Sequence, residues 1–202
     1  TMLVDAARGF LDKSAPVKAF RDLRDAGETH DAKMWKEMAA MGWAGVLVPE
    51  SAGGVDMGHA AAGILAQEMG KTLAVSPFLS TAVIAATALR HVSDARAEAA
   101  LAKIASGDAT YALAVDETSK FNPDATAMTA TAEGNGFRLT GKKTFVVDGA
   151  LADRLLVLAK TDNGLTLFDI PADRAGITRN AQNMIDARDS ARTLSTPEAE
   201  PI

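Results

Sequence analysis

The amino-acid sequence predicts an α+β protein in which an all-α helical bundle domain is followed by an antiparallel β-barrel or sandwich domain. Two observations predict this order. Over residues 1–108, Ala, Leu, Met and Glu are frequent and apolar side chains recur at helical spacing. Over residues 109–195, short β-rich stretches follow one another, separated by tight turns and without intervening helices. Residues 196–202 are interpreted as the start of a linker.

Spacing and end signals position the helices of the first domain. Met34, Trp35 and Met38 recur at helical spacing behind Asp31, which is a suitable N-cap, and Gly42 ends that helix. An apolar connector bounded by Pro and Gly residues follows. The many alanines allow helices to approach closely, as a compact bundle requires. Further helices are predicted over residues 4–11, 17–24, 57–71, 80–91 and 94–105.

Turn chemistry positions the strands of the second domain. Gly134-Asn135-Gly136 predicts a hairpin turn, because Asn and Gly adopt positive φ at low cost. Asp162-Asn163-Gly164 predicts a second one. Regularly spaced short strands are typical of an antiparallel barrel or sandwich. The predicted strands cover residues 111–115, 126–132, 137–139, 143–147, 154–161 and 165–170.

Composition excludes several classes of function. The 202 residues include no cysteine, which excludes thiolate chemistry and cysteine-ligated metal centres and fits a reducing compartment. Lys and Arg total 21 against 26 Asp and Glu, so the net charge of −5 argues against nucleic-acid binding. No apolar run reaches the roughly 18 residues of a membrane span. The first residues lack the pattern of a signal peptide, so we expect a cytoplasmic protein without a membrane partner.

The search for catalytic motifs is negative. No Gly-x-Gly-x-x-Gly follows a predicted strand, and no Walker loop or Gly-x-Ser-x-Gly elbow occurs. The three histidines, His30, His59 and His91, are far apart and share no helical face, so no metal site is predicted. Three glutamates stand singly without an evident acid–base partner: Glu50, Glu68 and Glu117. The residues by themselves therefore predict an architecture but no activity.

Several stretches, in order, are similar to one enzyme family. Residues 35–50 (WKEMAAMGWAGVLVPE) and 68–70 (EMG) resemble the N-terminal helical domain of acyl-CoA dehydrogenases, as do residues 53–54, 76–80 and 101–107. In that family a β-barrel middle domain follows. Its pattern is matched by residues 112–114 with Glu117, by residues 141–149 (GKKTFVVDG) and by residues 152–153. The resemblance extends over nearly the whole chain.

The resemblance implies α,β-dehydrogenation of an acyl-CoA thioester, with a glutamate base removing the α-proton and the β-hydrogen leaving as hydride to FAD. It also implies an electron-transfer acceptor as partner, and a homo- or hetero-oligomer. The cofactor-binding positions it implies are Val115, Asp116, Phe145, Val146 and Val147, and the substrate-binding positions are Gln67 and Asp124. Two alternatives stay open: Phe145 as a core residue of the barrel, and Gln67 as a solvent-facing helix residue.

The chain departs from the family pattern at the flavin loop. The family's loop runs Ala-x-Thr-Glu-Pro-x-x-Gly-Ser-Asp, whereas Asp116 stands here in place of the Thr. Glu117 and Asp124 match, but they lie seven positions apart rather than five, and the Pro and Gly-Ser are replaced as well. Val147 replaces a Thr or Ser that hydrogen-bonds the flavin edge. An anion at Asp116 repels phosphate unless it points away, so these changes weaken the expectation of FAD and CoA binding.

The sequence also departs from the family pattern at its end. Residues 183–192 resemble the segment that closes the middle domain, and the family's C-terminal helical domain, which carries the catalytic glutamate, does not follow. We therefore assign no catalytic residue here and expect the chain by itself to be inactive and to bind FAD weakly or not at all. Two hypotheses remain. The chain is a shortened FAD enzyme, or it is a non-catalytic partner subunit of a heteromeric dehydrogenase with a degenerate flavin site.

Overall fold

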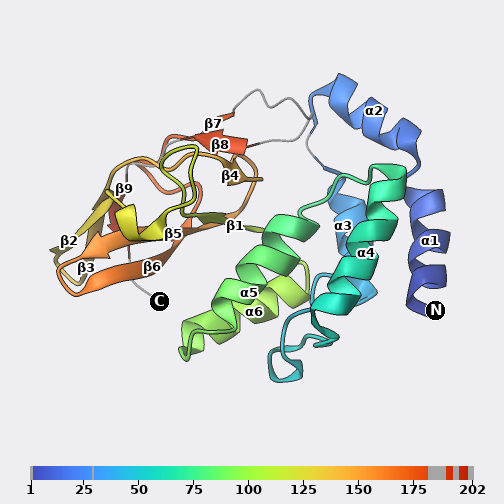
Figure 1. Cartoon of the computed structure of the whole chain (residues 1–202), viewed down its shortest axis with the longest axis horizontal. Coiled ribbons are helices and arrows are strands. Elements are labelled where there is room, and N and C mark those ends of the chain that lie inside the picture. Colours follow the sequence, from blue (N-terminus) through green and yellow to red (C-terminus); the bar gives the residue numbers. More distant parts are fainter. Residues whose placement is uncertain (1, 29, 182–189, 193–195, 200–202) are drawn as a thin grey trace. The chain divides into compact units, whose positions relative to one another are not determined.

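The structure is a computed structural model that describes residues 2–28, 30–181, 190–192 and 196–199 (Figure 1). The chain forms two compact units, Thr1–Ala109 and Thr110–Ile202. The first unit is helical and the second is built on strands. The prediction of a helical domain followed by a β domain is confirmed.

The first unit packs its helices around a core of Leu, Met and Ala side chains that include Leu11, Met38 and Leu65. Helix α1 contacts α4, and α5 contacts α6 (Figure 1). The prediction of one helix over residues 80–91 is refined, because a π-helical segment, η2, runs directly into the short helix α5. The elements are α1 (Met2–Ser14), α2 (Val17–Ala26), α3 (Ala32–Ala40), η1 (Glu50–Ala52), α4 (Gly58–Thr72), η2 (Phe78–Ala85), α5 (Ala86–Leu89) and α6 (Ala95–Ala105).

The predicted helix ends of the first unit are confirmed by their hydrogen bonds. The Asp31 carboxylate accepts from the backbone N–H groups of Lys33 at 2.8 Å and Met34 at 3.1 Å, as an N-cap does. Asp94 caps α6 in the same way. Gly42 follows α3 at φ +81°, a conformation that favours glycine.

The connector after α3 is buried and folds back on the chain that follows it. Val48 and Leu47 have no exposed surface. The backbone N–H of Met57 donates to the carbonyl of Val46 at 2.9 Å. A β-carbon at Gly54 would lie 1.9 Å from the Val48 carbonyl oxygen, so this close approach requires glycine.

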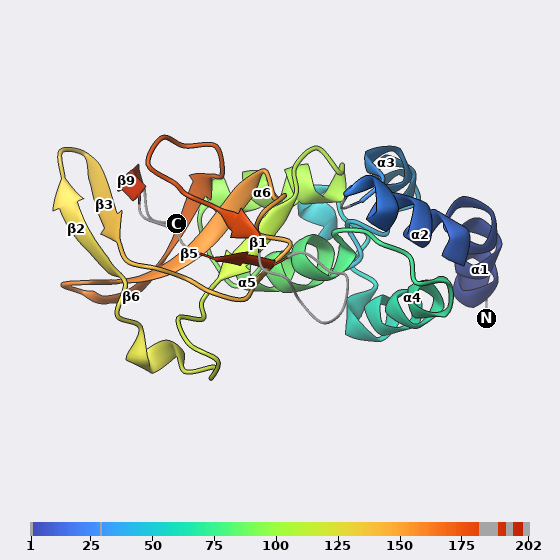
Figure 2. The same cartoon turned by 90° about the horizontal axis from the view of Figure 1, so that it is seen from above.

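The second unit centres on β5, which pairs with β6 along its whole length and with β1 and β2. The hairpin of β2 and β3 turns at the predicted position, because Glu133 lies opposite Gly136 (Figure 2). The elements are β1 (Tyr111–Ala114), η3 (Pro123–Ala125), β2 (Thr129–Glu133), β3 (Gly136–Thr140), β4 (Val146–Val147), β5 (Arg154–Thr161), β6 (Gly164–Pro171), β7 (Asn180–Ala181), β8 (Ser190–Arg192) and β9 (Thr196–Ala199).

The expected sheet geometry needs a correction. Strands β1 and β5 pair in parallel. A parallel pair needs a long connection, and here the chain passes through β2, β3 and β4 between the two strands. The sheet is therefore mixed, and over the described residues its strand order, β1-β5-β2-β3-β9, does not close into a barrel. Strands β4, β8 and β7 form a second sheet. The core of this unit includes Met128, Leu139, Val157, Phe168 and Ile170.

One predicted strand is largely absent. Of residues 143–147, only Val146 and Val147 form a strand, β4. Phe145 has φ +54°, which breaks an extended conformation, and Lys143 turns its side chain into the protein. The predicted closing segment at 183–192 lies outside the described residues except for its last three positions, which belong to β8.

Candidate functional site

The candidate site is organised around Lys143, whose side chain has no exposed surface. Its ammonium group donates to the carbonyl oxygen of Val115 at 3.0 Å and to Oε1 of Glu117 at 2.7 Å. Burial lowers the pKa of Lys143, while the carboxylates of Glu117 and Asp116 oppose that effect. These two contacts attach Lys143, which follows β3, to the segment that follows β1.

Glu117 uses both of its carboxylate oxygens. Oε1 accepts from the backbone N–H of Met128 at 2.9 Å as well as from Lys143, and Oε2 accepts from the N–H of Ala127 at 2.8 Å. Burial raises the pKa of Glu117, but the hydrogen bonds from Lys143, Met128 and Ala127 outweigh it and lower the pKa overall. Glu117 therefore joins the two ends of the loop over residues 118–126, which carries η3 and stands away from the strands in Figure 2.

A backbone hydrogen bond continues this arrangement. The N–H of Thr144 donates to the carbonyl of Asp116 at 2.7 Å, so residues 115–117 lie beside residues 143–144. Phe145 follows at φ +54° with 41% of its surface exposed, which is incompatible with a buried core position in this unit. The structure thus brings together the two stretches that hold the five predicted cofactor residues: Val115 and Asp116 in one, Phe145, Val146 and Val147 in the other.

The Asp116 carboxylate interacts electrostatically with the Lys143 ammonium. Its charge favours the protonated ammonium of Lys143. Its Oδ1 is buried and has no hydrogen-bond partner within the described part of the chain. A buried acceptor without a partner is costly, so Oδ1 is an unsatisfied acceptor within the candidate site.

The two predicted substrate residues lie in different units. Gln67 is exposed on α4, and Asp124 is exposed within η3. The exposure of Gln67 agrees with the solvent-facing alternative. The role of both residues in substrate binding stays a prediction.

Comparison with known proteins identifies the family. The model of the family described as "Acyl-CoA dehydrogenase, N-terminal domain" matches residues 1–108, which is more than half of the chain. The chain belongs to the acyl-CoA dehydrogenase family.

Curated and solved relatives agree with this assignment. The acyl-CoA dehydrogenase FadE27 of Mycobacterium tuberculosis is 31% identical over 162 residues, which cover 80% of this chain and 42% of FadE27. The Tcur3481-Tcur3483 steroid ACAD G363A variant superimposes with a TM-score of 0.88 at 27% identity, over 99% of this chain and 55% of that one. The ChsE4-ChsE5 complex from Mycobacterium tuberculosis gives 0.86 at 26% identity, over 98% and 54%. The chain spans about half the length of the relatives it matches.

The three glutamates that stand singly in the sequence lie in different surroundings. Glu68 is 4% exposed and accepts from Lys71 at 2.6 Å and from Arg8 at 3.4 Å. The hydrogen bond from Lys71 lowers its pKa. The oxygens of Glu117 are occupied as well, and Glu50 is exposed at the start of η1. No group of histidines and carboxylates among the described residues forms a candidate metal site.

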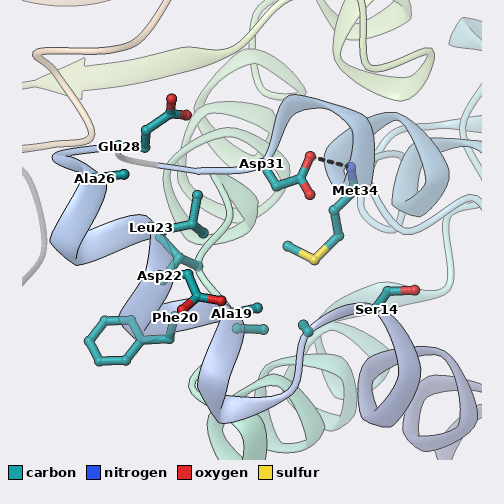
Figure 3. Close-up of a pocket in the computed structure, with 12 residues that line it drawn as sticks. Ser14, Ala19, Phe20, Asp22, Leu23, Ala26, Glu28, Asp31 and Met34 are labelled. Carbon is teal, nitrogen blue, oxygen red and sulfur yellow. Dashed lines mark hydrogen bonds between the residues drawn. The ribbon is translucent and has the colours of Figure 1, made fainter.

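A cavity of about 290 Å³ lies in the first unit, between α2 and the start of α3 (Figure 3). Leu23 on α2 and Met34 on α3 approach it from opposite sides, while Asp22, Glu28 and Asp31 line it as well. None of the predicted site residues lines this cavity. The sequence does not predict this cavity. The signal that it offers is the amphipathic pattern of α2, and none of that helix's residues is fully buried.

In the described part of the chain, no helix has the length and apolar character of a membrane span.

Proposed function

We propose that this chain supplies the N-terminal and middle parts of an FAD-dependent acyl-CoA dehydrogenase that acts by α,β-dehydrogenation of an acyl-CoA thioester. Family membership supports the class of reaction. The observation that carries the proposal is the hydrogen-bonded arrangement of residues 115–117 and 143–144, since it joins the stretches that hold Asp116 and Phe145. An electron-transfer acceptor would receive the electrons.

The residues at this site fit a flavin better than a phosphate. The exposed ring of Phe145 offers an aromatic face for stacking. Asp116 Oδ1 is a buried acceptor without a partner, and FAD carries donors in its ring N–H and its ribityl hydroxyls. An ionised pyrophosphate offers only acceptors and negative charge, so it does not complement Asp116.

Each residue has a limited part in the proposed reaction. FAD, when bound, supplies the acceptor for the hydride that leaves the β-carbon. Phe145 would hold the ring system by stacking, and Asp116 would accept one hydrogen bond from it. Val147 contributes only its backbone, because its side chain has neither donor nor acceptor. The base that removes the α-proton is proposed to come from outside these two units, since the oxygens of Glu68 and Glu117 are occupied.

A non-catalytic partner subunit is the second candidate function. Asp116 in place of the family's Thr and the longer loop to Asp124 favour it. The names of two similar structures, the ChsE4-ChsE5 complex and the Tcur3481-Tcur3483 steroid ACAD, each join two components. In this role the chain would assemble with a second acyl-CoA dehydrogenase subunit that holds the flavin.

One experiment separates the candidates. The native protein is purified with whatever sequence or subunit accompanies this chain, and its visible flavin absorbance and dye-linked oxidation of acyl-CoA thioesters are measured. Straight-chain thioesters and a steroid-derived one form the panel, because one similar structure is a steroid ACAD. Turnover with flavin bound by this polypeptide supports the enzyme. Flavin and turnover that appear only when a second subunit is present support the partner subunit.

A further inference from the structure

Lys143 is a buried charge that no part of the proposed chemistry uses. Its side chain has no exposed surface, although it follows the exposed Lys142 directly in the sequence. Burying an ammonium group is unfavourable unless partners replace its water. Here the partners are the Val115 carbonyl and the Glu117 carboxylate, at 3.0 Å and 2.7 Å. The fold thus accepts a costly group at the centre of the candidate site.

The backbone groups that are bound by Lys143 and by the residue after it belong to predicted cofactor positions. Val115 and Asp116 are predicted cofactor positions, and the Lys143 ammonium binds the carbonyl of Val115 itself. The residue after Lys143 binds the carbonyl of Asp116 through its backbone N–H. Phe145, one position further on, is held at φ +54°, which is uncommon for an aromatic residue and persists where the surroundings fix it.

Glu117 extends the same restraint to the other end of the loop. Its carboxylate holds the N–H groups of Ala127 and Met128 while it binds Lys143. Gly141 packs against Met128 as well, since a β-carbon there would overlap that residue. The pair therefore connects the chain after β1, the chain before β2 and the chain after β3.

We infer that Lys143 and Glu117 form a positioning pair, which contacts no ligand itself and holds residues 115–116 and 145–147 in one preformed surface for the flavin ring. The inference rests on the proposed function for the identity of the ligand. The restraint on the two segments is a property of the chain and can be measured without the ligand. A preformed surface binds more tightly because less ordering is needed on binding.

The test uses the native protein with Lys143→Met, Glu117→Gln and the double variant, and with Lys142→Met as the matched control. Methionine keeps much of the length of the lysine without its charge, and the double variant leaves no charge of this pair unpaired. Hydrogen exchange is followed by mass spectrometry over residues 115–128 and 141–147, with residues 154–171 reporting on the folding of the unit. FAD affinity is measured by titration.

Both single variants should exchange faster at 115–128 and 141–147 while 154–171 stays protected. They should also bind FAD at least about tenfold more weakly. The double variant should also exchange faster than wild type in both segments and bind FAD more weakly, but by no more than the more strongly affected single variant, because the two residues act as a unit. Lys142→Met should behave as wild type.

Three results would overturn the inference. The first is unchanged exchange in both segments in the double variant. The second is FAD affinity within about twofold of wild type in a variant whose segments do exchange faster. The third is weaker FAD binding without faster exchange, which would make Lys143 or Glu117 a direct contact. A wild-type protein that binds no FAD contradicts the proposed function instead, and exchange of the two segments then decides the positioning role by itself.

Discussion

Gly141 lies so close to Met128 that a β-carbon on the glycine would come within 2.8 Å of the methionine Cγ. Gly141 also has φ +151°, a conformation that side chains rarely adopt. Met128 is 1% exposed and belongs to the core of the second unit, so it has little room to move. The turn after β3 is thus fitted against the start of β2, next to the Lys143 anchor.

Gly141→Ala should therefore destabilise the second unit. We expect a loss of about 2–5 kcal/mol in the free energy of unfolding, from overlap and backbone strain together. Gly134→Ala is the matched control, because Gly134 also has positive φ but open space around it, and it should cost about 1 kcal/mol. Denaturant unfolding of both variants measures this. Equal losses would show that contact with Met128 contributes nothing.

Glu117→Gln should lower stability more at neutral pH than in acid. The folded-state pKa of Glu117 lies below its ordinary value of 4.5, so its stabilisation is complete above that value and is lost as the pH falls through the folded pKa. At neutral pH the variant removes the carboxylate that is hydrogen-bonded to the buried Lys143 ammonium, which costs up to about 3–5 kcal/mol because Asp116 and the Val115 carbonyl compensate the charge only in part.

The measurement is the free energy of unfolding of both proteins between about pH 2 and pH 7. The difference should shrink below pH 4.5. Glu133→Gln serves as control, because Glu133 pairs with Arg138 where both side chains are exposed, and its effect should be much smaller. A difference that does not change with pH would contradict the ionic role of Glu117.

The 202-residue chain by itself should not oxidise acyl-CoA thioesters. The carboxylates of Glu68 and Glu117 are held by cations and backbone donors, and their lowered pKa values make them weak bases. Without a positioned base the rate should fall by about 100- to 10,000-fold. The assay supplies FAD, a dye acceptor and a panel of thioesters. Turnover by this chain would refute the expectation, and Glu68→Gln or Glu117→Gln would identify the base only if turnover is lost while the variant still folds and is saturated with FAD.

Features that depend on neighbours in the sequence were predictable. Asp31 caps α3 and Gly42 follows its end because each acts within a few residues of its own position. The β2–β3 turn at residues 133–136 is equally local. The parallel pairing of β1 with β5 was not predicted, since it joins Tyr111 to Arg154 across three intervening strands.

The candidate site was also predictable only in part. The residues at 115–116 and 145–147 came from resemblance to the family, and hydrogen bonds bring the two stretches together. Lys143 was not among the predicted site residues, because a lysine in a β-like stretch is normally solvent-facing, as the adjacent Lys142 is. Its partners, Val115 and Glu117, lie 28 and 26 residues earlier, so only the folded chain shows that the lysine is buried.

Replacement of Asp116 separates the two functional candidates. An unpaired anion about 4 Å from a phosphate costs roughly 1–4 kcal/mol at effective dielectric constants of about 80 to 20. In this structure, however, Oδ1 of Asp116 is buried and the carboxylate interacts favourably with Lys143. We therefore expect the carboxylate not to repel the cofactor phosphates.

Asp116→Thr, which restores the family's residue, should accordingly change FAD affinity by less than about threefold in the native protein. Asp116→Asn is the matched control, because it keeps the shape and an acceptor while removing the charge. Flavin fluorescence titrations at two ionic strengths measure both variants. Repulsion of the phosphates would instead make wild-type affinity improve with salt, while the affinity of the threonine variant would not, because salt screens exposed like charges. If Asp116→Thr gains affinity by more than about tenfold and the gain shrinks in high salt, the carboxylate faces the phosphates and the degenerate partner subunit is the better assignment.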